Sequence, residues 1–174
     1  EAIVLAYYED TQERVAQRAR DRFCETGDAA ERVRAVLRAQ VDVVAPDRRL
    51  LAGLFRSVAS PEDDLSVFSG RTERIRRAAI ELYEEALVGS AGAALEPRFL
   101  EIVALALWAL HLGTILYLVH DESARQERTR KLVEDTADLF AAALPALPFL
   151  AASFGEKLAD VLADAGLTGR PRSS

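Results

Sequence analysis

The sequence predicts an all-α fold, in which about seven helices pack as an antiparallel bundle. Apolar residues recur at three- and four-residue steps along most of the 174-residue chain, as they do on one face of a helix. Proline and glycine interrupt these periodic stretches, and no stretch alternates apolar and polar residues as a half-buried strand would. The stretch 102–119 carries no formal charge if His111 is neutral, so it fits a helix at the centre of the bundle.

The composition limits the kinds of protein that this chain can be. Half of the residues are hydrophobic and 29% are charged, which suits one domain with a sizeable core and not a disordered chain. The net charge of −6 disfavours a nucleic-acid-binding surface on this segment, because phosphate contacts need clustered positive charge. Cys24 is the only cysteine, so no disulfide can form within the chain.

The first two predicted helices are separated by a glycine. Residues 1–24 form the first helix, and residues 29–44 form the second. The second begins at a capping box of Asp28 and Glu31 and ends at Pro46. The residues expected to face inward are Val4, Tyr8, Val15, Ala19 and Phe23 in the first helix and Val33, Val36, Leu37, Val41 and Val44 in the second.

Two further helices, 47–58 and 71–87, precede the central one. Between them, Ser60 followed by Pro61 signals a short helical piece that a glycine interrupts. A loop is expected over residues 89–95. The residues expected to be buried are Leu50, Leu51, Leu54, Phe55 and Val58 in the first of these helices and Ile75, Ala79, Leu82, Tyr83 and Ala86 in the second.

The central helix, residues 97–119, has two different faces. Small residues allow two helix backbones to approach closely, and the only tryptophan of the chain lies on the bulkier face. The bulkier face holds Ala104, Leu105, Trp108, His111, Leu112, Ile115 and Val119, and the slimmer face holds Ile102, Ala106, Ala109, Leu110, Gly113 and Tyr117.

These two faces favour a symmetric dimer on the slim face and a core or ligand pocket on the Trp108 face. Two alternatives are a helix buried in a large monomer and a membrane span. A span is disfavoured because Glu101 and His111 lie inside the segment and no basic cluster marks one end only.

Two helices follow the central one. A capping box of Ser123 and Gln126 opens a helix that runs to Ala143. A pair of prolines separates it from the last helix, residues 149–165. The residues on the apolar faces are Leu132, Val133, Thr136, Leu139 and Phe140 in the first of these helices and Leu150, Phe154, Leu158, Val161 and Leu162 in the second.

The sequence lacks the motifs of common enzymes and metal sites. It contains no CxxC, Gly-rich phosphate loop, HExxH or GxSxG. His111 and His120 lie on opposite faces of one helix and cannot bind one metal together within a chain. Cys24 has no histidine near it in the sequence that would lower its pKa. We therefore predict no catalytic residue, metal or cofactor, and His111 either makes a core hydrogen bond or contacts a ligand beside Trp108.

Several short motifs resemble TetR-like transcriptional regulators. Residues 1–8, EAIVLAYY, are similar to the first helix of their regulatory domain, which follows directly on the helix-turn-helix. Leu50-Leu51-x-x-Leu54-Phe55, residues 65–69 and Ile75-Arg76 are similar to the middle of one bacterial subgroup. Trp108-x-x-His111-x-Gly113, then Tyr117 and Asp121-x-Ser123, resembles the long central helix and the turn after it. The resemblance covers about residues 1–145.

The resemblance implies the C-terminal regulatory domain of a cytoplasmic, homodimeric repressor that senses a small, mostly apolar ligand. Residues 1–166 would form the ligand-binding and dimerisation domain and residues 167–174 a flexible tail. The first helix begins at Glu1 without a cap, so a DNA-binding domain that contacts operator DNA is expected upstream of residue 1. The alternative is an all-helical homodimeric interaction module with a filled core and no ligand or DNA role.

Site residues follow from these expectations. The expected pocket residues are Leu54, Phe55, Phe68, Tyr83, Trp108, His111 and Leu112. The expected dimer interface is formed by the central helix and the helix after it, through Ala106, Ala109, Leu110, Gly113, Tyr117, Thr129, Leu132, Thr136 and Phe140. No membrane partner is expected.

Overall fold

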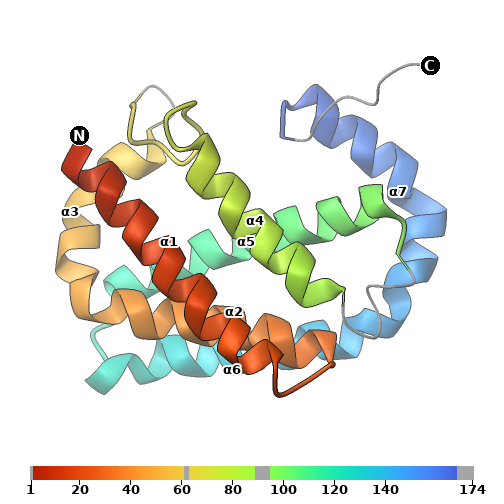
Figure 1. Ribbon diagram of the computed structural model, residues 1–174, viewed down its shortest axis with the longest axis horizontal. Coiled ribbons are helices and arrows are strands. Elements are labelled where there is room, and N and C mark those ends of the chain that lie inside the picture. Colours follow the sequence, from red (N-terminus) through yellow and green to blue (C-terminus); the bar gives the residue numbers. More distant parts are fainter. Residues whose placement is uncertain (1, 61–62, 89–94, 168–174) are drawn as a thin grey trace.

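The computed structural model describes residues 2–60, 63–88 and 95–167, with residues 55–59 described by their backbone alone. These residues form seven α-helices and no strand, which confirms the predicted all-α fold (Figure 1). Single 3-10 turns join α2 to α3 and α6 to α7, so the helices make five continuous stretches. The helices are α1 (Ala2–Phe23), α2 (Ala29–Val44), α3 (Arg48–Ala59), α4 (Glu73–Leu87), α5 (Pro97–His120), α6 (Glu127–Ala143) and α7 (Leu147–Asp164).

The prolines after α2 and α6 join two helices where the sequence predicted a stop. Pro46 lies in the 3-10 turn Ala45–Asp47, and Pro145 lies in the 3-10 turn Leu144–Ala146. Proline is tolerated in the first turn of a helix because its missing N–H would have no partner there. Each pair of helices therefore follows on directly without a loop.

Residues 63–72 form consecutive turns, where the sequence predicted a short helix. Ser66 N donates to Asp63 O at 2.9 Å, and the Thr72 hydroxyl donates to Ser66 O. These short polar side chains offer the backbone local partners other than those of a helix. Pro61 and most of the predicted loop 89–95 lie outside the described residues.

Asp121 organises the junction between α5 and α6, where the sequence predicted a capping box of Ser123 and Gln126. Asp121 Oδ1 accepts from Ser123 N and Oγ at 2.9 and 2.6 Å. Asp121 Oδ2 accepts from Thr129 N and Oγ1 at 2.8 and 2.7 Å. Gln126 has a φ of 55° and makes no side-chain cap. Burial raises the pKa of Asp121, but the four hydrogen bonds outweigh burial and hold the pKa well below its usual value.

Helix α2 lies at the centre of the bundle. It packs against α1, α4, α5 and α6. Figure 1 shows α1 and α4 across the front, α5 crossing behind them, and α7 at the N-terminal end of α5. Four helices, α1, α2, α4 and α5, therefore surround one region of the core. All the residues of α2 that were expected to face inward are buried, namely Val33, Val36, Leu37, Val41 and Val44.

Charged side chains fasten α6 to α2. Arg34 donates to Glu134 at 2.9 Å and to Asp138 at 2.7 Å. Arg38 reaches both carboxylate oxygens of Glu134 at 2.6 Å. The Arg34 side chain is only 12% exposed, so these pairs are screened less than pairs on an open surface. The contacts fix the position of α6 against the core.

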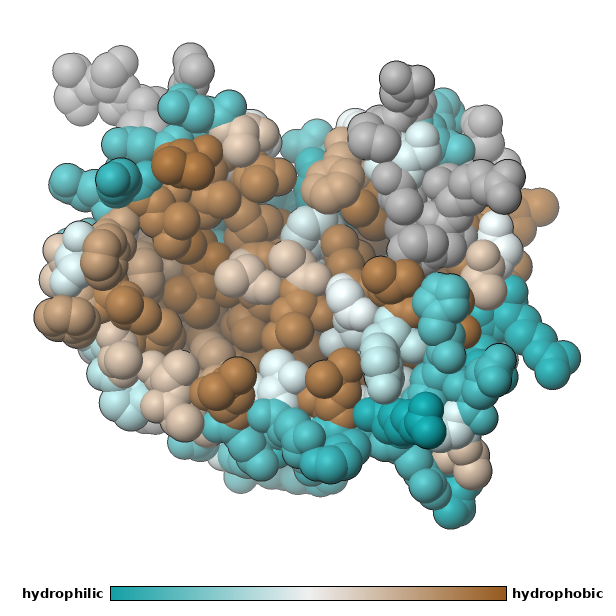
Figure 2. Space-filling model, turned by 180° about the vertical axis from the view of Figure 1, so that it is seen from behind, coloured by the Kyte–Doolittle hydropathy of each residue, from teal (hydrophilic) through white to brown (hydrophobic). Residues whose placement is uncertain are grey.

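Helices α6 and α7 carry apolar side chains that the rest of the described chain leaves uncovered. The sequence predicted that Leu150, Phe154, Leu158 and Val161 are buried, but all four are exposed in the protomer, Phe154 by 58%. Figure 2 shows a broad hydrophobic surface on the rear face, toward the side where α7 lies. Other exposed apolar residues are Leu132, Leu139 and Phe149 on these helices. Leu50 on α3 was also expected to be buried and is exposed. The helical pattern identified an apolar face, but this protomer does not cover it.

Candidate ligand-binding cavity

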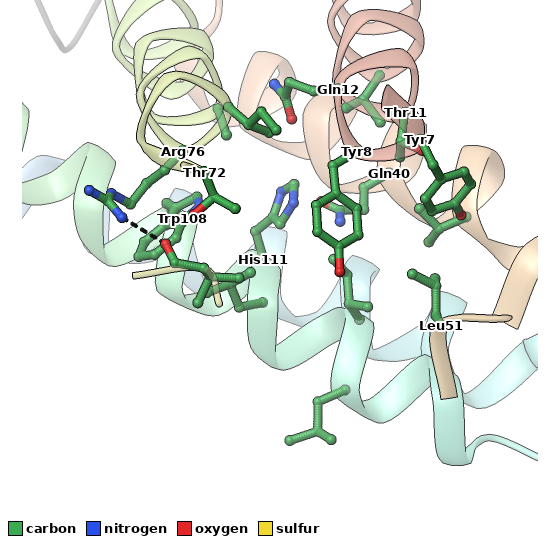
Figure 3. Close-up of a pocket in the computed structure, with 18 of the residues that line it drawn as sticks. Tyr7, Tyr8, Thr11, Gln12, Gln40, Leu51, Thr72, Arg76, Trp108 and His111 are labelled. Carbon is green, nitrogen blue, oxygen red and sulfur yellow. Dashed lines mark hydrogen bonds between the residues drawn. The ribbon is translucent and has the colours of Figure 1, made fainter. Parts of the chain in front are cut away.

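A cavity of about 310 Å³ lies between α1, α2, α4 and α5 (Figure 3). Its size is near the lower end of small-molecule sites. Most of its wall is apolar, and the polar side chains come from a few positions. The lining residues are Tyr7, Tyr8, Thr11, Gln12 and Val15 of α1; Gln40 and Val44 of α2; Leu51 of α3; Val67 and Thr72; Ile75, Arg76 and Ala79 of α4; and Trp108, His111, Leu112, Gly113, Ile115 and Leu116 of α5.

Helix α5 supplies one wall of the cavity. Trp108, His111 and Leu112 line it, and these are residues that the sequence placed on the bulky face. Gly113 also borders the cavity, although the sequence placed it on the slim face. The cavity therefore borders Gly113 as well as the face of α5 that carries Trp108.

The other expected pocket residues lie around this wall and not in it. Tyr83 is fully buried behind His111, and its hydroxyl lies 3.2 Å from His111 Nδ1. Phe68 is 52% exposed and packs its ring edge-on against Trp108, with 6.2 Å between the ring centroids. Leu54 is half-buried and does not line the cavity. The side chain of Phe55 lies outside the described residues.

Three polar atoms at the cavity are buried and have no hydrogen-bond partner among the described residues. They are Tyr8 OH, Gln12 Nε2 and Gln40 Oε1, whereas the Thr11 hydroxyl interacts with that of Tyr7. A buried polar atom without a partner costs about 1–3 kcal/mol, so folded proteins rarely keep several in one place. Figure 3 shows Tyr8, His111 and Gln40 close together in the view, and Gln12 apart from them at its upper edge. A bound molecule can pair with these atoms when their side chains turn toward it, because the atoms themselves are covered in this conformation.

Sequence reasoning missed this polar cluster, although a signal was present. Gln40 stands four residues from both Val36 and Val44, inside the apolar stripe of α2. Thr11 and Gln12 fall between Tyr8 and Val15 on the inward face of α1. A glutamine at an inward position of a helix marks either a buried hydrogen bond or a binding site. Only the three-dimensional neighbours distinguish these two possibilities.

His111 is a neutral, oriented group in the cavity wall. Burial lowers the pKa of His111 to about 3 and raises the pKa of the Tyr83 hydroxyl. Within the described residues, His111 Nδ1 is the only acceptor that the Tyr83 hydroxyl reaches. If this hydroxyl donates to Nδ1, the ring proton of His111 lies on Nε2. His111 then offers an N–H donor on the side of the ring that Tyr83 does not occupy.

Charged side chains are scarce in the described lining of the cavity, although Asp47 accepts a hydrogen bond from Tyr7 and Asp63 helps to raise the pKa of Tyr8. Arg76 is the only charged residue in the described lining, and its Nη1 donates to Val67 O at 2.7 Å. Figure 3 shows Arg76 at the end of the cavity beside Thr72 and Trp108, away from Tyr8. Within the described residues, no three His, Cys, Asp or Glu side chains lie where they could hold a metal ion. The arrangement suits binding of an uncharged molecule better than acid–base chemistry.

The residues expected at a dimer interface lie on the outer side of α5 and on α6. Ala106, Ala109 and Gly113 are exposed, and Tyr117 is 43% exposed. Leu132 is 38% exposed, whereas Leu110, Thr136 and Phe140 are half-buried. Thr129 is fully buried within the protomer and bonds Asp121, so its side chain is not available to a second subunit in this conformation.

Judged by length and composition alone, two helical stretches among the described residues could span a bilayer. The first is α5, and half of the residues in its most apolar segment are buried within the protein. The second is the continuous stretch of α6 and α7, and only 6% of the residues in its most apolar segment are buried. A buried core helix passes this test, so the first stretch is explained by its packing. The second is the uncovered apolar face described above.

Comparison with known families agrees with the architecture. A family model described as "Tetracyclin repressor-like, C-terminal domain" matches residues 32–152. No curated protein matches the chain. The matched range runs from α2 into α7 and includes the cavity wall on α4 and α5, and it spans more than half of the chain. The chain therefore belongs to the TetR-like regulators and contains their C-terminal domain.

Proposed function

We propose that this chain is the ligand-sensing and dimerising domain of a TetR-like transcriptional repressor of the cytoplasm, and that it has no catalytic role. The cavity between α1 and α5 is the observation that carries the proposal. Its wall is apolar, and it combines an oriented His111 with several unpaired polar atoms. Sites for small molecules typically have an apolar lining with a few convergent polar groups. Residues 1–166 act as this domain, and residues 167–174 as its tail.

The proposed mechanism is a shift between two placements of α1. Tyr8, Thr11 and Gln12 of α1 line the cavity, so a bound molecule contacts this helix directly. In TetR-like regulators the helix follows the helix-turn-helix, which we place upstream of residue 1. A ligand that prefers one placement of α1 changes the separation of the two DNA-binding units relative to half-sites about 34 Å apart.

The test is a titration of the parent protein that contains the DNA-binding part. A molecule that binds the cavity is added to saturation, and the affinity for operator DNA is measured at constant salt. We expect a change of about fivefold or more, which is a typical coupling between two sites. Ile75→Trp, which narrows the cavity, should abolish both the binding and the change. An operator affinity that stays constant while the cavity is saturated would contradict the sensing role.

A second copy of the chain is the proposed cover for the uncovered apolar face. Helices α6 and α7 expose apolar residues, and α5 exposes small residues that allow a close approach of another helix. Two-fold dimers are the commonest soluble assemblies. Such a dimer would also remove the exposed hydrophobic surface seen in Figure 2 from water. We infer that α7 joins α5 and α6 in the interface.

Substitution of Phe154 tests this interface. Light scattering of the purified chain should give twice the chain mass of 19.1 kDa. Phe154→Glu places a charge in the interface and should give the mass of one chain, because an unpaired buried charge is costly. Ile3→Glu, at a position that is 86% exposed on α1, is the control and should keep the dimer. A wild-type chain that stays monomeric at all concentrations would refute the dimer.

The interaction module without a ligand is the second candidate. An interaction module of this kind would have a tightly packed core without a cavity. The cavity of about 310 Å³ with unpaired Gln12 and Gln40 does not favour that candidate. Failure of every apolar probe to bind would make it the better explanation.

A further inference from the structure

We propose that the cavity selects an uncharged, mainly apolar molecule that carries one group able both to donate and to accept hydrogen bonds, such as a carboxamide. This inference rests on the proposed function, in which the cavity binds a ligand. It adds the chemical class of the ligand and the residues that read its head group. Those residues are Tyr8, Gln40 and His111.

The body of the ligand is set by the apolar wall. Val15, Val44 and Ile75 line the space together with the flat ring of Trp108. A volume of about 310 Å³ accommodates a body of one or two rings but not a large lipid or macrocycle. Apolar contact with this wall supplies most of the affinity, at about 25 cal/mol per Å² of surface removed from water.

The head group is set by atoms that the protein leaves unpaired. Gln40 is only 2% exposed, and its Oε1 has no partner. Gln12 Nε2 and Tyr8 OH are buried and unpaired as well. A glutamine amide and a hydroxyl each provide donors and acceptors, so they pair best with a group that does the same. A carboxamide bound beside Tyr8 would connect α1, which carries Tyr8, to α2, which carries Gln40.

Charged head groups are disfavoured by the same wall. A cation would leave water without a carboxylate in the described lining, because the nearest acids, Asp47 beside Tyr7 and Asp63 near Tyr8, are not part of that lining. An anion would find a single cation, Arg76, whose Nη1 is already bonded to Val67 O. Arg76 lies at one end of the cavity, and His111 lies between it and Tyr8 in this view (Figure 3). His111 stays neutral at physiological pH because burial lowers its pKa to about 3.

Three matched competitors test the head group on the 174-residue chain. The neutral fluorescent dye N-phenyl-1-naphthylamine is bound first, and 2-naphthamide, 2-naphthoate and 2-naphthylmethylammonium are compared as competitors near neutral pH. The three share one apolar body and differ in charge. We expect 2-naphthamide to displace the dye at concentrations about tenfold lower than either ion. Displacement by 2-naphthoate at the same or a lower concentration would overturn the proposal and would point to Arg76 instead.

Two variants identify the residues that bind the head group. Tyr8→Phe removes the hydroxyl and Gln40→Leu removes the amide, and each keeps the approximate shape of the side chain. Each should reduce the advantage of 2-naphthamide over the two ions to about threefold or less, with every displacement compared with the dye affinity of the same variant. Gln17→Leu is the control, because Gln17 is exposed on α1 and donates to Asp21 at 2.8 Å. An advantage that survives in both cavity variants would refute the assignment.

The outcomes separate the two proposals. If the dye does not bind the wild-type chain, or binds Ile75→Trp equally well, the cavity is not a ligand site and both proposals fail. If the dye binds in the cavity but the three competitors rank in another order, only the head-group inference fails.

Discussion

Two buried polar clusters lie against α5, and they differ in whether their hydrogen bonds are complete. At the C-terminal end of the helix, Asp121 is 4% exposed and accepts four hydrogen bonds from Ser123 and Thr129. Near the middle of the helix, Gln40 is 2% exposed, yet its Oε1 has no partner, and neither do atoms of Tyr8 and Gln12. Burial is therefore similar in the two places, and hydrogen bonding is not.

The difference shows how a structural polar cluster is told apart from a binding cluster. Around Asp121 the chain satisfies its own buried groups, so the cluster stabilises the turn between α5 and α6. Around Gln40 the chain bears the cost of unpaired groups, about 1–3 kcal/mol for each. A cluster that costs stability needs another reason to be present, and a molecule in the cavity provides one. Three predictions test this contrast, in order of decreasing effect.

Removal of the Asp121 carboxylate should have the largest effect. Asp121→Ala removes the acceptor of the N–H groups of Ser123 and Thr129 and of the buried Thr129 hydroxyl, whereas the Ser123 hydroxyl still accepts from Arg128 N. We expect the free energy of unfolding to fall by roughly 2–4 kcal/mol, as measured by urea denaturation at fixed protein concentration. Asp28→Ala is the matched control, because the exposed Asp28 caps α2 through one bond from Glu31 N and should cost about 1 kcal/mol. Equal losses in the two variants would show that burial of the Asp121 cluster adds nothing.

The buried His111 should give a smaller effect that depends on pH. Burial lowers the folded-state pKa of His111 from 6.5 to about 3, so the unfolded chain binds the proton more tightly. The stability due to neutral His111 is complete above pH 6.5 and is lost as the pH falls toward 3. Between pH 7 and 5 we expect the free energy of unfolding to fall by about 2 kcal/mol.

Two histidine variants check this pH window. His111→Gln retains an acceptor for Tyr83 but does not titrate, so its stability should lose this slope between pH 7 and 5. His120→Gln, at the exposed end of the same helix, should keep the slope. The Asp121 carboxylate, with a pKa held below its usual 3.8, is charged throughout this range, and its contribution decreases only at lower pH. An unchanged slope in His111→Gln would mean that His111 is not buried in solution.

The fold was largely predictable because helical periodicity reports which side chains avoid water. The inward residues of α2, such as Val33 and Leu37, are buried as expected, and Asp28 accepts from Glu31 N as its capping box predicted. The same periodicity does not say which chain covers a face. Phe154 and Val161 belong to an apolar stripe, but they stay exposed in one protomer, and the sequence could not distinguish these cases.

The cavity was predictable only in part. The bulky face of α5 correctly pointed to a pocket wall at Trp108, His111 and Leu112. Tyr83 has the same helical periodicity as a pocket residue, yet the crossing of α4 over α5 places it behind His111. The unpaired state of Gln40 depends on neighbours from α1 that are distant in sequence. Polar residues inside an apolar stripe are visible in the sequence, but their partners are not.

Replacement of Gln40 should have the smallest effect on stability. The sign of the change in the free energy of unfolding distinguishes the Gln40 cluster from the Asp121 cluster. Gln40→Leu exchanges an unpaired buried amide for an apolar group of similar shape. Such an exchange is nearly neutral or stabilising. We therefore expect a free energy of unfolding between about 0.5 kcal/mol below and about 1 kcal/mol above that of the wild-type chain. Urea denaturation of the ligand-free chain measures it, with Gln17→Leu as the exposed control. A loss of about 2 kcal/mol or more would mean that Gln40 holds the fold together as Asp121 does, and the unpaired cluster would then be structural.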